Sequence, residues 1–394
     1  MLVFTFPGQG SQRHGMGAPW VDHPSWELVG DASEAVERDV ARLLLDADQA
    51  ELTETRNAQL SCFTLSMVVL DAIERTGLAP AAAAGHSLGE YSALVAVGAL
   101  AFDDGVRLVA ERGEAMQLAA EDNPGTMAAV LGLDVEQCWV ACRRADAEVW
   151  VANDNAPGQV VIAGDADGVA RAGEIARELG AKKVMRFPVG GAFHTPLMAP
   201  ARTRLRKAIA SCRFTDCEVP VVANVDATSH RDAEDWPALL SAQLSSPVLW
   251  RQTLSELGAL GATHVVEVGS GGVLTGMTKR GLAGVTPLPV GTPEDVDTLL
   301  EAMAPTAHIA AHPLLNDGEH LYVRERLVVA PAAGVFTPDA DVPAEGGALH
   351  VGGLLGTVGG TDVRSPFAGA LQGMLALDGE RVVEGQPIAW LLAG

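Results

Sequence analysis

Ser87 is the central residue of the pentapeptide GHSLG (85–89), which follows the small apolar run AAAAG (81–85) and opens a helix-like pattern that ends near Gly98. A serine in G-x-S-x-G between a strand and a helix forms the nucleophile elbow of α/β enzymes. The flanking glycines remove side chains that would clash in so sharp a turn, and the helix start aims backbone N–H groups at a developing oxyanion. A chance match in a glycine-rich chain is the competing interpretation. The pattern predicts a hydrolase-like parallel-sheet α/β core around a nucleophilic serine.

A nucleophilic serine needs a base, and ten histidines compete for that role. His86 is too close in sequence to reach the hydroxyl of its neighbour. His194 lies in GGAFHTPLM (190–198), a glycine-flanked loop after a predicted strand. Loops of this kind supply catalytic groups, so His194 is the predicted base.

Arg112 falls on the apolar stripe of a predicted helix, together with Val109 and Met116. A guanidinium on a buried face must find an anion, because it cannot lose its charge. The anion is either an internal carboxylate, such as that of Glu111 or Glu114, or the carboxylate of a substrate. The spacing alone leaves both alternatives open.

The sequence at about 125–190 alternates between strand-like and helix-like runs in the order β-α-β-β-α-β. This is the ferredoxin-like pattern, at a length that suits a small inserted subdomain. The sequence on both sides carries buried-strand and amphipathic-helix patterns of an α/β core. We therefore expect a first domain over residues 1–303 with an inserted ferredoxin-like subdomain.

The pattern changes after residue 303. Residues 304–317 have the composition of a linker, and residues 318–394 are rich in Gly, Val and Pro with short strand-like runs. A weak internal repeat relates VVAPAAGVF (328–336) to VRSPFAGAL (363–371). Two such short β halves cannot each bury a face alone. We expect them to close on each other as a small all-β barrel-sandwich domain.

The formal net charge of −23 argues against nucleic acid or an anionic membrane surface as a partner. No apolar stretch approaches the ~18 residues that span a bilayer, and the opening MLVFTF lacks the basic segment of a signal peptide. The five cysteines are odd in number and lack C-x-x-C spacing, which indicates reduced thiols rather than disulfides or a zinc site. We expect a cytoplasmic protein without a metal.

About the first 300 residues resemble the malonyl-CoA:acyl-carrier-protein transacylases, the FabD-like acyltransferases. Many motifs in order carry this resemblance, and together they are highly specific. They are FPGQGSQ (6–12), Gln59, GHSLGEYSALV (85–95), ERGEAMQ (111–117), GTMAAVLGL (125–133), NDNAPGQVVIAG (153–164), AFHTPLM (192–198), NVDA (224–227), AQLSSPVLW (242–250) and EVGSGGVLTGMTKR (267–280).

The resemblance implies a role for each matching position. Ser87 would become the malonyl ester, and His194 would act as general base and acid. The backbone N–H groups of Gln9 and Leu88 would form the oxyanion hole. Arg112 would bind the malonyl carboxylate, which favours the second alternative above.

Further positions follow from the same resemblance. The backbone carbonyl of Gln243 would orient the histidine, and no triad aspartate emerges. Gln59 and Met116 would line the acyl pocket. Family members with Leu after the serine and Phe before the histidine, as Leu88 and Phe193 here, tend to take malonyl. The physical reason is that a bulky Phe193 would leave little room for a 2-methyl branch. A pocket excludes one methyl group by only ~1–3 kcal/mol.

The implied reaction is ping-pong transfer of malonyl from malonyl-CoA to the phosphopantetheine thiol of an acyl carrier protein, with no metal or redox cofactor. The main rival is a serine esterase or thioesterase, and a non-catalytic carrier-docking scaffold is another. A nucleotide phosphate site at the glycine loops PGQGSQ (7–12) and VGSGGVLTGMTK (268–279) matches neither phosphate-binding fingerprint. The basic run RTRLRK (202–207) is either a contact for coenzyme A or an acidic carrier, or a solvated helix face. Fatty-acid synthesis, polyketide assembly and malonate decarboxylation all use this chemistry.

The C-terminal repeat resembles the biotinyl/lipoyl barrel domains, in which a lysine at a hairpin carries the cofactor. The hairpin is expected near Gly356–Gly360, where there is no lysine, and none occurs after Lys279. Covalent biotin or lipoate through lysine is therefore excluded here. The domain is then either a docking or scaffold module or an inert stabilising appendage, and our hypothesis is that it docks a partner protein.

Overall fold

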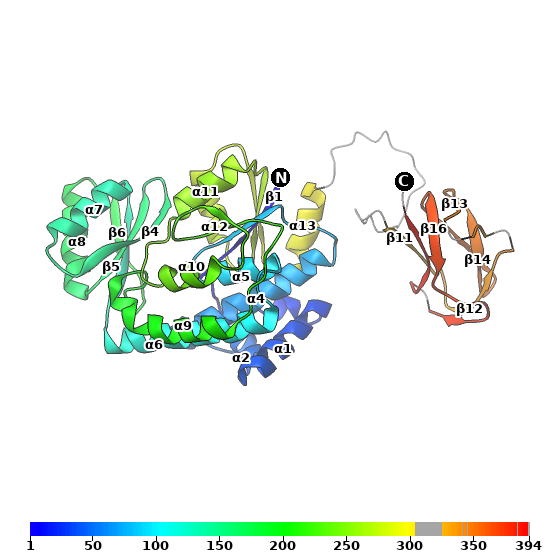
Figure 1. Ribbon diagram of the computed structural model, residues 1–394, viewed down its shortest axis with the longest axis horizontal. Helices are drawn as coiled ribbons and strands as arrows, with labels where there is room; N and C mark the ends of the chain where they lie inside the picture. The colour runs from blue at the N-terminus through cyan, green and yellow to red at the C-terminus, as the bar shows by residue number, and fades with distance from the viewer. Residues whose placement is uncertain (304–324, 341, 345, 384, 393–394) are drawn as a thin grey trace. The chain divides into compact units, whose positions relative to one another are not determined.

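A computed structural model describes residues 1–303, 325–340, 342–344, 346–383 and 385–392 (Figure 1). The chain forms two compact units. The larger contains the described residues up to Met303 apart from Thr76–Leu78, and the smaller contains the described residues from 325 on. The linker expected at 304–317 lies outside the described residues.

The core of the larger unit is a six-stranded sheet in the order β10-β9-β1-β2-β7-β8. All neighbours pair in parallel except β7 and β8 at one edge. The strands are β1 (Leu2–Phe6), β2 (Ala82–Gly85), β7 (Val221–Val222), β8 (Ser229–His230), β9 (His264–Val268) and β10 (Thr286–Val290). The predicted mixed α/β fold with a parallel-sheet core is confirmed.

Helices cover this sheet because its strands are apolar on both faces. On one face, the buried residues Val3 and Ala84 pack with Trp250 and Leu274 of the helices α11 and α12. The helices are α1 (Glu27–Val36), α2 (Val40–Leu45), α3 (Gln49–Thr53), α4 (Thr55–Glu74), α5 (Gly89–Ala96), α6 (Phe102–Asp122), α9 (Ala199–Ser211), α10 (Trp236–Gln243), α11 (Trp250–Ala259), α12 (Val273–Gly281) and α13 (Pro293–Met303). The central helix α4 is buried along most of its length, and α6 packs against both α4 and α9.

The inserted segment folds as a second, antiparallel sheet with its own core. Its elements alternate as the sequence predicts, and the sheet order is β4-β5-β3-β6. Figure 1 shows α7 and α8 together on one side of this sheet. The elements are β3 (Thr126–Leu131), α7 (Val135–Arg144), β4 (Val149–Ala156), β5 (Gln159–Gly164), α8 (Ala166–Glu178) and β6 (Lys183–Arg186).

Strand β4 joins the inserted sheet to the core. The backbone of Val248 donates to Ala152 O and accepts from Asp154 N, both at 2.9 Å. The buried carboxylate of Asp154 also pairs with Arg251 of α11 at 2.8 Å. These contacts hold the alternate residues Asn153 and Asn155 beside the cavity described below.

The described part of the smaller unit contains strands and turns around one apolar core. Two four-stranded sheets run in the orders β11-β18-β16-β13 and β15-β14-β12-β17. The strands are β11 (Glu325–Val329), β12 (Gly334–Pro338), β13 (Ala348–Leu349), β14 (Leu354–Val358), β15 (Thr361–Arg364), β16 (Gly369–Met374), β17 (Arg381–Val382) and β18 (Pro387–Leu392). Strands β14 and β15 form the expected hairpin, and its two turn residues, Gly359 and Gly360, have φ values of 56° and 87°.

Candidate active site

The turn between β2 and α5 is tight enough to require glycine on both sides of Ser87. A Cβ atom on Gly85 would lie 1.8 Å from the backbone carbon of Gly89, and one on Gly89 would lie 1.9 Å from the carbonyl oxygen of Phe6. Ser87 itself has a φ of 54°, in the left-handed region that is rare for a residue with a side chain. The local sequence therefore forms the predicted elbow and exposes the serine hydroxyl at the carboxyl end of β2.

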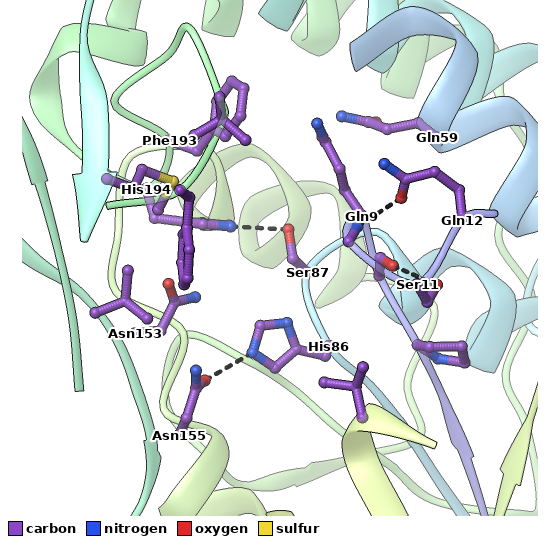
Figure 2. Close-up of a pocket in the computed structure, with 18 of the residues that line it drawn as sticks. Gln9, Ser11, Gln12, Gln59, His86, Ser87, Asn153, Asn155, Phe193 and His194 are labelled. Atoms are coloured by element: carbon purple, nitrogen blue, oxygen red, sulfur yellow. Dashed lines mark hydrogen bonds between the residues drawn. The ribbon is translucent and has the colours of Figure 1, made fainter. Parts of the chain in front are cut away.

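His194 lies beside Ser87 although the two residues are 107 positions apart. Its Nε2 is 2.8 Å from Ser87 Oγ (Figure 2). Its Nδ1 is 2.9 Å from the backbone oxygen of Gln243. A carbonyl oxygen only accepts, so the proton sits on Nδ1 and the lone pair of Nε2 faces the serine hydroxyl. The imidazole is thus oriented as a base by a backbone carbonyl rather than by an aspartate.

The environment of His194 keeps this base uncharged. The residue is 4 % exposed. Burial, followed by the positive charge of Arg112, lowers the pKa of His194 to about 3. The imidazole is therefore neutral over the physiological pH range and can accept the serine proton.

Arg112 is buried and points into the same cavity. Its Nη1 donates to Gln59 Oε1 at 2.7 Å, and its Nη2 donates to Ser87 Oγ at 3.0 Å and Gln243 Oε1 at 2.9 Å. The guanidinium also lies over the ring of Tyr91, 5.2 Å from its centroid. All of these partners are neutral groups.

The internal carboxylates that could have neutralised Arg112 are engaged elsewhere. Glu111 pairs with Arg204 at 2.7 Å, and Glu114 pairs with Arg56 at 3.1 Å. Among the described residues, no carboxylate forms an ion pair with Arg112. The first alternative from the sequence is wrong for both glutamates, and the buried cation has capacity for an external anion.

Four of the remaining predicted residues line a cavity of about 480 Å³, whereas Leu88 and Gln243 are not among its lining residues. Its lining includes Gln9, Gln59, Met116 and Phe193 together with Ser87, His194 and Arg112. Figure 2 shows the side chains of His194 and Gln9 on opposite sides of Ser87. This volume suits a small-molecule site.

Leu88 does not line the cavity with its side chain, which is buried beneath the elbow. Its predicted contribution is the backbone N–H. A Cβ atom on Gly8 would lie 3.7 Å from Leu88 N and 2.4 Å from His86 O, so the Gly8-Gln9 backbone is packed directly against the elbow. The two predicted oxyanion-hole segments are therefore neighbours.

Two residues that hold the elbow and Gln243 by hydrogen bonds were missing from the predicted site. Asn224 holds the backbone of the elbow by two hydrogen bonds: its Oδ1 accepts from Ser87 N at 2.7 Å, and its Nδ2 donates to Gly85 O at 2.6 Å. Glu90 is fully buried behind it. Burial raises the pKa of Glu90 to about 7, although its hydrogen bonds act in the opposite direction. The available signal was a glutamate in the otherwise apolar start of α5.

Other polar motifs of the sequence have structural partners. The carboxylate of Glu267 accepts from the backbone N–H groups of Gly272, Leu274 and Thr275, so it occupies the start of α12 where a phosphate would bind. In the basic run on α9, Arg204 pairs with Glu111 and Arg202 donates to Ser241. Among the described residues, no cluster of His, Cys, Asp and Glu could hold a metal ion, and no helix is long and apolar enough to cross a membrane.

Comparisons with known proteins agree with this geometry. The acyl transferase domain family matches residues 3–318. The malonyl CoA-acyl carrier protein transacylase of Bacillus subtilis (strain 168) is 40% identical over 307 residues, which cover 77% of this chain and 97% of the relative. The transacylase of the same name from Escherichia coli (strain K12) is 40% identical over 305 residues, covering 76% of this chain and 99% of the relative.

Solved structures are also similar. The malonyl CoA-acyl carrier protein transacylase (fabD) of Coxiella burnetii has a TM-score of 0.74 and 36% identity, covering 76% of this chain and 96% of that one. A malonyl-transacylase solved in complex with its type II PKS acyl-carrier protein has a TM-score of 0.74 and 36% identity, covering 76% of this chain and 99% of that one.

Proposed function

This chain belongs to the acyl transferase family, with the malonyl CoA-acyl carrier protein transacylases among its relatives, and we propose that it transfers malonyl from malonyl-CoA to an acyl carrier protein through an ester on Ser87. The observation that carries this proposal is a buried arginine that forms no ion pair with any carboxylate of the described residues and lies within hydrogen-bond distance of the nucleophile. A site of this kind favours an acyl group that itself bears a carboxylate.

The first half-reaction acylates the enzyme. Ser87 Oγ attacks the thioester carbonyl of malonyl-CoA while its proton passes to Nε2 of His194, which is 2.8 Å away. The backbone N–H groups of Gln9 and Leu88 stabilise the oxyanion. The C–S bond then breaks, and the imidazolium returns its proton to the coenzyme A sulfur.

The second half-reaction runs through the same groups in reverse. The phosphopantetheine thiol of the carrier gives its proton to His194 and attacks the ester carbonyl, after which Ser87 Oγ leaves and recovers the proton. The hydrogen bond from His194 Nδ1 to Gln243 O keeps the ring orientation in both halves. Water competes with the thiol at this stage, and its exclusion separates a transferase from a thioesterase.

The acyl group is selected by charge and size. Arg112 would leave its contact with Ser87 Oγ and bind the malonyl carboxylate in a bidentate pair, between Gln59 and Gln243. Met116, held by a 3.2 Å contact with Gln59, and Phe193 would limit the space for a 2-methyl branch.

The proposal extends to the parts around the site. We assign the inserted sheet to a ferredoxin-like subdomain and the C-terminal strands to a biotinyl/lipoyl-like domain without covalent biotin or lipoate, with domain limits of 1–303 and 318–394. The C-terminal domain would dock a partner protein. The reaction would need no metal or cofactor and would occur in the cytoplasm, where the five free cysteines stay reduced.

Intact-protein mass after mixing with malonyl-CoA tests this function. The expected result is a malonyl adduct that Ser87→Ala abolishes and that a holo carrier protein discharges by accepting the group. An adduct that is hydrolysed to free malonate at the same rate with and without the carrier would indicate a hydrolase. If no adduct forms, the remaining alternative is a non-catalytic scaffold that docks the carrier protein.

A further inference from the structure

Glu90 is an acidic side chain that is buried completely near Ser87 and His194, in the second position of α5. Its Oε1 accepts from the backbone N–H of Asn224 at 2.6 Å, and its Oε2 accepts from Nε2 of Gln243 at 2.5 Å. The carboxylate touches neither the cavity nor the serine hydroxyl. Its position therefore raises the question of what an expensive buried charge does there.

The contacts of Gln243 show how that carboxylate reaches the site. The Gln243 amide has two distinct ends, of which Nε2 only donates and Oε1 only accepts. Nε2 donates to Glu90 and, at 2.8 Å, to the carbonyl oxygen of Ser87. Oε1 accepts from Arg112 Nη2 at 2.9 Å. Since Glu90 and the Ser87 carbonyl take both amide protons, the oxygen must point at the guanidinium.

We propose that Glu90 is a positioning residue that holds the Gln243 amide in this one orientation and thereby fixes Arg112 for an acyl group that carries a carboxylate. The Glu90 carboxylate also attracts the buried guanidinium electrostatically. The two groups form no ion pair that would compete with the substrate carboxylate. A glutamate in a direct salt bridge would occupy the N–H donors of Arg112. The neutral Gln243 amide lies between Glu90 and Arg112, so a substrate carboxylate can still replace it as the acceptor. This inference rests on the proposed malonyl transfer.

Substitution of Glu90 by glutamine tests the orientation argument with little change in volume. The Asn224 N–H still needs an acceptor, so the new amide would turn its oxygen there and its NH2 group toward Gln243. Two NH2 groups would then face each other, and Gln243 would have to move or turn. Either movement weakens the acceptor that holds Arg112.

The experiment measures single-turnover loading of the full-length protein with malonyl-CoA and, in parallel, acetyl-CoA, at about pH 8, where Glu90 is ionised. We expect Glu90→Gln to lower kcat/KM for malonyl by about 10- to 100-fold, mainly through KM, because a hydrogen bond to a charged group is lost. Acetyl loading should fall at least about tenfold less. The matched control is Glu111→Gln on α6, half-exposed and paired with Arg204, which should stay within about twofold of the parent.

A double-mutant cycle with Gln243→Met separates a route through the amide from a general effect on folding. If Glu90 acts through Gln243, the double variant should lose no more malonyl preference than Gln243→Met alone. Additive losses, or an unchanged malonyl-to-acetyl ratio in Glu90→Gln, would overturn the inference. If Glu90→Gln does not fold, Gln243→Met decides alone, and an unchanged ratio in that variant refutes the route. A parent protein that forms no malonyl adduct would instead refute the proposed function.

Discussion

Replacement of Arg112 by alanine should reverse the acyl preference of the enzyme. In the parent, Arg112 Nη1 donates to Gln59, and Nη2 donates to Ser87 and Gln243. Both nitrogens can donate to a substrate carboxylate instead. Each charge-assisted hydrogen bond contributes about 1.5–3 kcal/mol. Loss of two such bonds corresponds to a fall of roughly 10²- to 10⁴-fold in kcat/KM for malonyl-CoA.

Acetyl-CoA should show no such loss, because the acetyl group has no carboxylate for Arg112 to bind. The charge of Arg112 is the second cause, after burial, that lowers the pKa of His194. Its removal should raise that pKa and make the imidazole a stronger base, so acetyl loading should be unchanged or faster. The variant also leaves buried amide oxygens of Gln59 and Gln243 without their donor, at a cost of about 1–3 kcal/mol each in the free energy of unfolding.

The assay is time-resolved intact mass with each coenzyme A ester, on protein whose folding is verified by thermal denaturation. Arg204→Ala is the matched control, since Arg204 pairs with Glu111 on the surface of α9 and α6. It should leave both rates within about twofold of the parent. Equal losses of malonyl and acetyl loading in Arg112→Ala would refute the carboxylate-binding role.

Three further results are expected. Gly89→Ala should prevent accumulation of folded protein, because its Cβ would lie 1.9 Å from Phe6 O, and a thermal melt equal to that of the parent would contradict the elbow geometry. The pKa of His194 is about 3 in the folded protein and about 6.5 in the unfolded chain, so only the unfolded chain takes up a proton between these values. The free energy of unfolding should therefore fall by about 1.4 kcal/mol per pH unit as the pH decreases from 6.5 toward 3. Urea unfolding at pH 6.5 and 4.5 should show this fall in the parent and a smaller one in His194→Gln, and equal falls in the two proteins would disprove it. Deletion after about residue 310 should leave malonyl loading of a small-molecule thiol intact, and loss of loading by a folded truncated protein would argue against a separate docking role for the C-terminal domain.

Much of the fold could be predicted because its signals are local. Strand and helix patterns gave the order of the inserted segment, and the glycine-flanked Ser87 placed the elbow between β2 and α5. The pairing order of the central sheet depends on contacts between distant segments, so periodicity alone could not supply it.

The site divides in the same way. Ser87, His194 and Arg112 stood out because a hydroxyl, an imidazole and a buried guanidinium each have few explanations in their local context. Glu90 and Asn224 did not, because their importance lies in partners 134 to 153 positions away. A buried glutamate in an apolar helix start was the available signal, and it became meaningful only beside Gln243.

The sequence by itself determined the sharp turn at Ser87, because a Cβ atom on Gly85 would clash with the backbone of Gly89 and Glu90, only a few residues further along the chain. Only the tertiary structure decided what Arg112 binds. Its neighbours Glu111 and Glu114 pair with Arg204 on α9 and Arg56 on α4. The packing of α6 against these two helices therefore leaves neither carboxylate available to Arg112. Short-range sterics act through chain connectivity, whereas the partner of a long charged side chain is chosen by whichever groups the fold brings within about 3 Å of it.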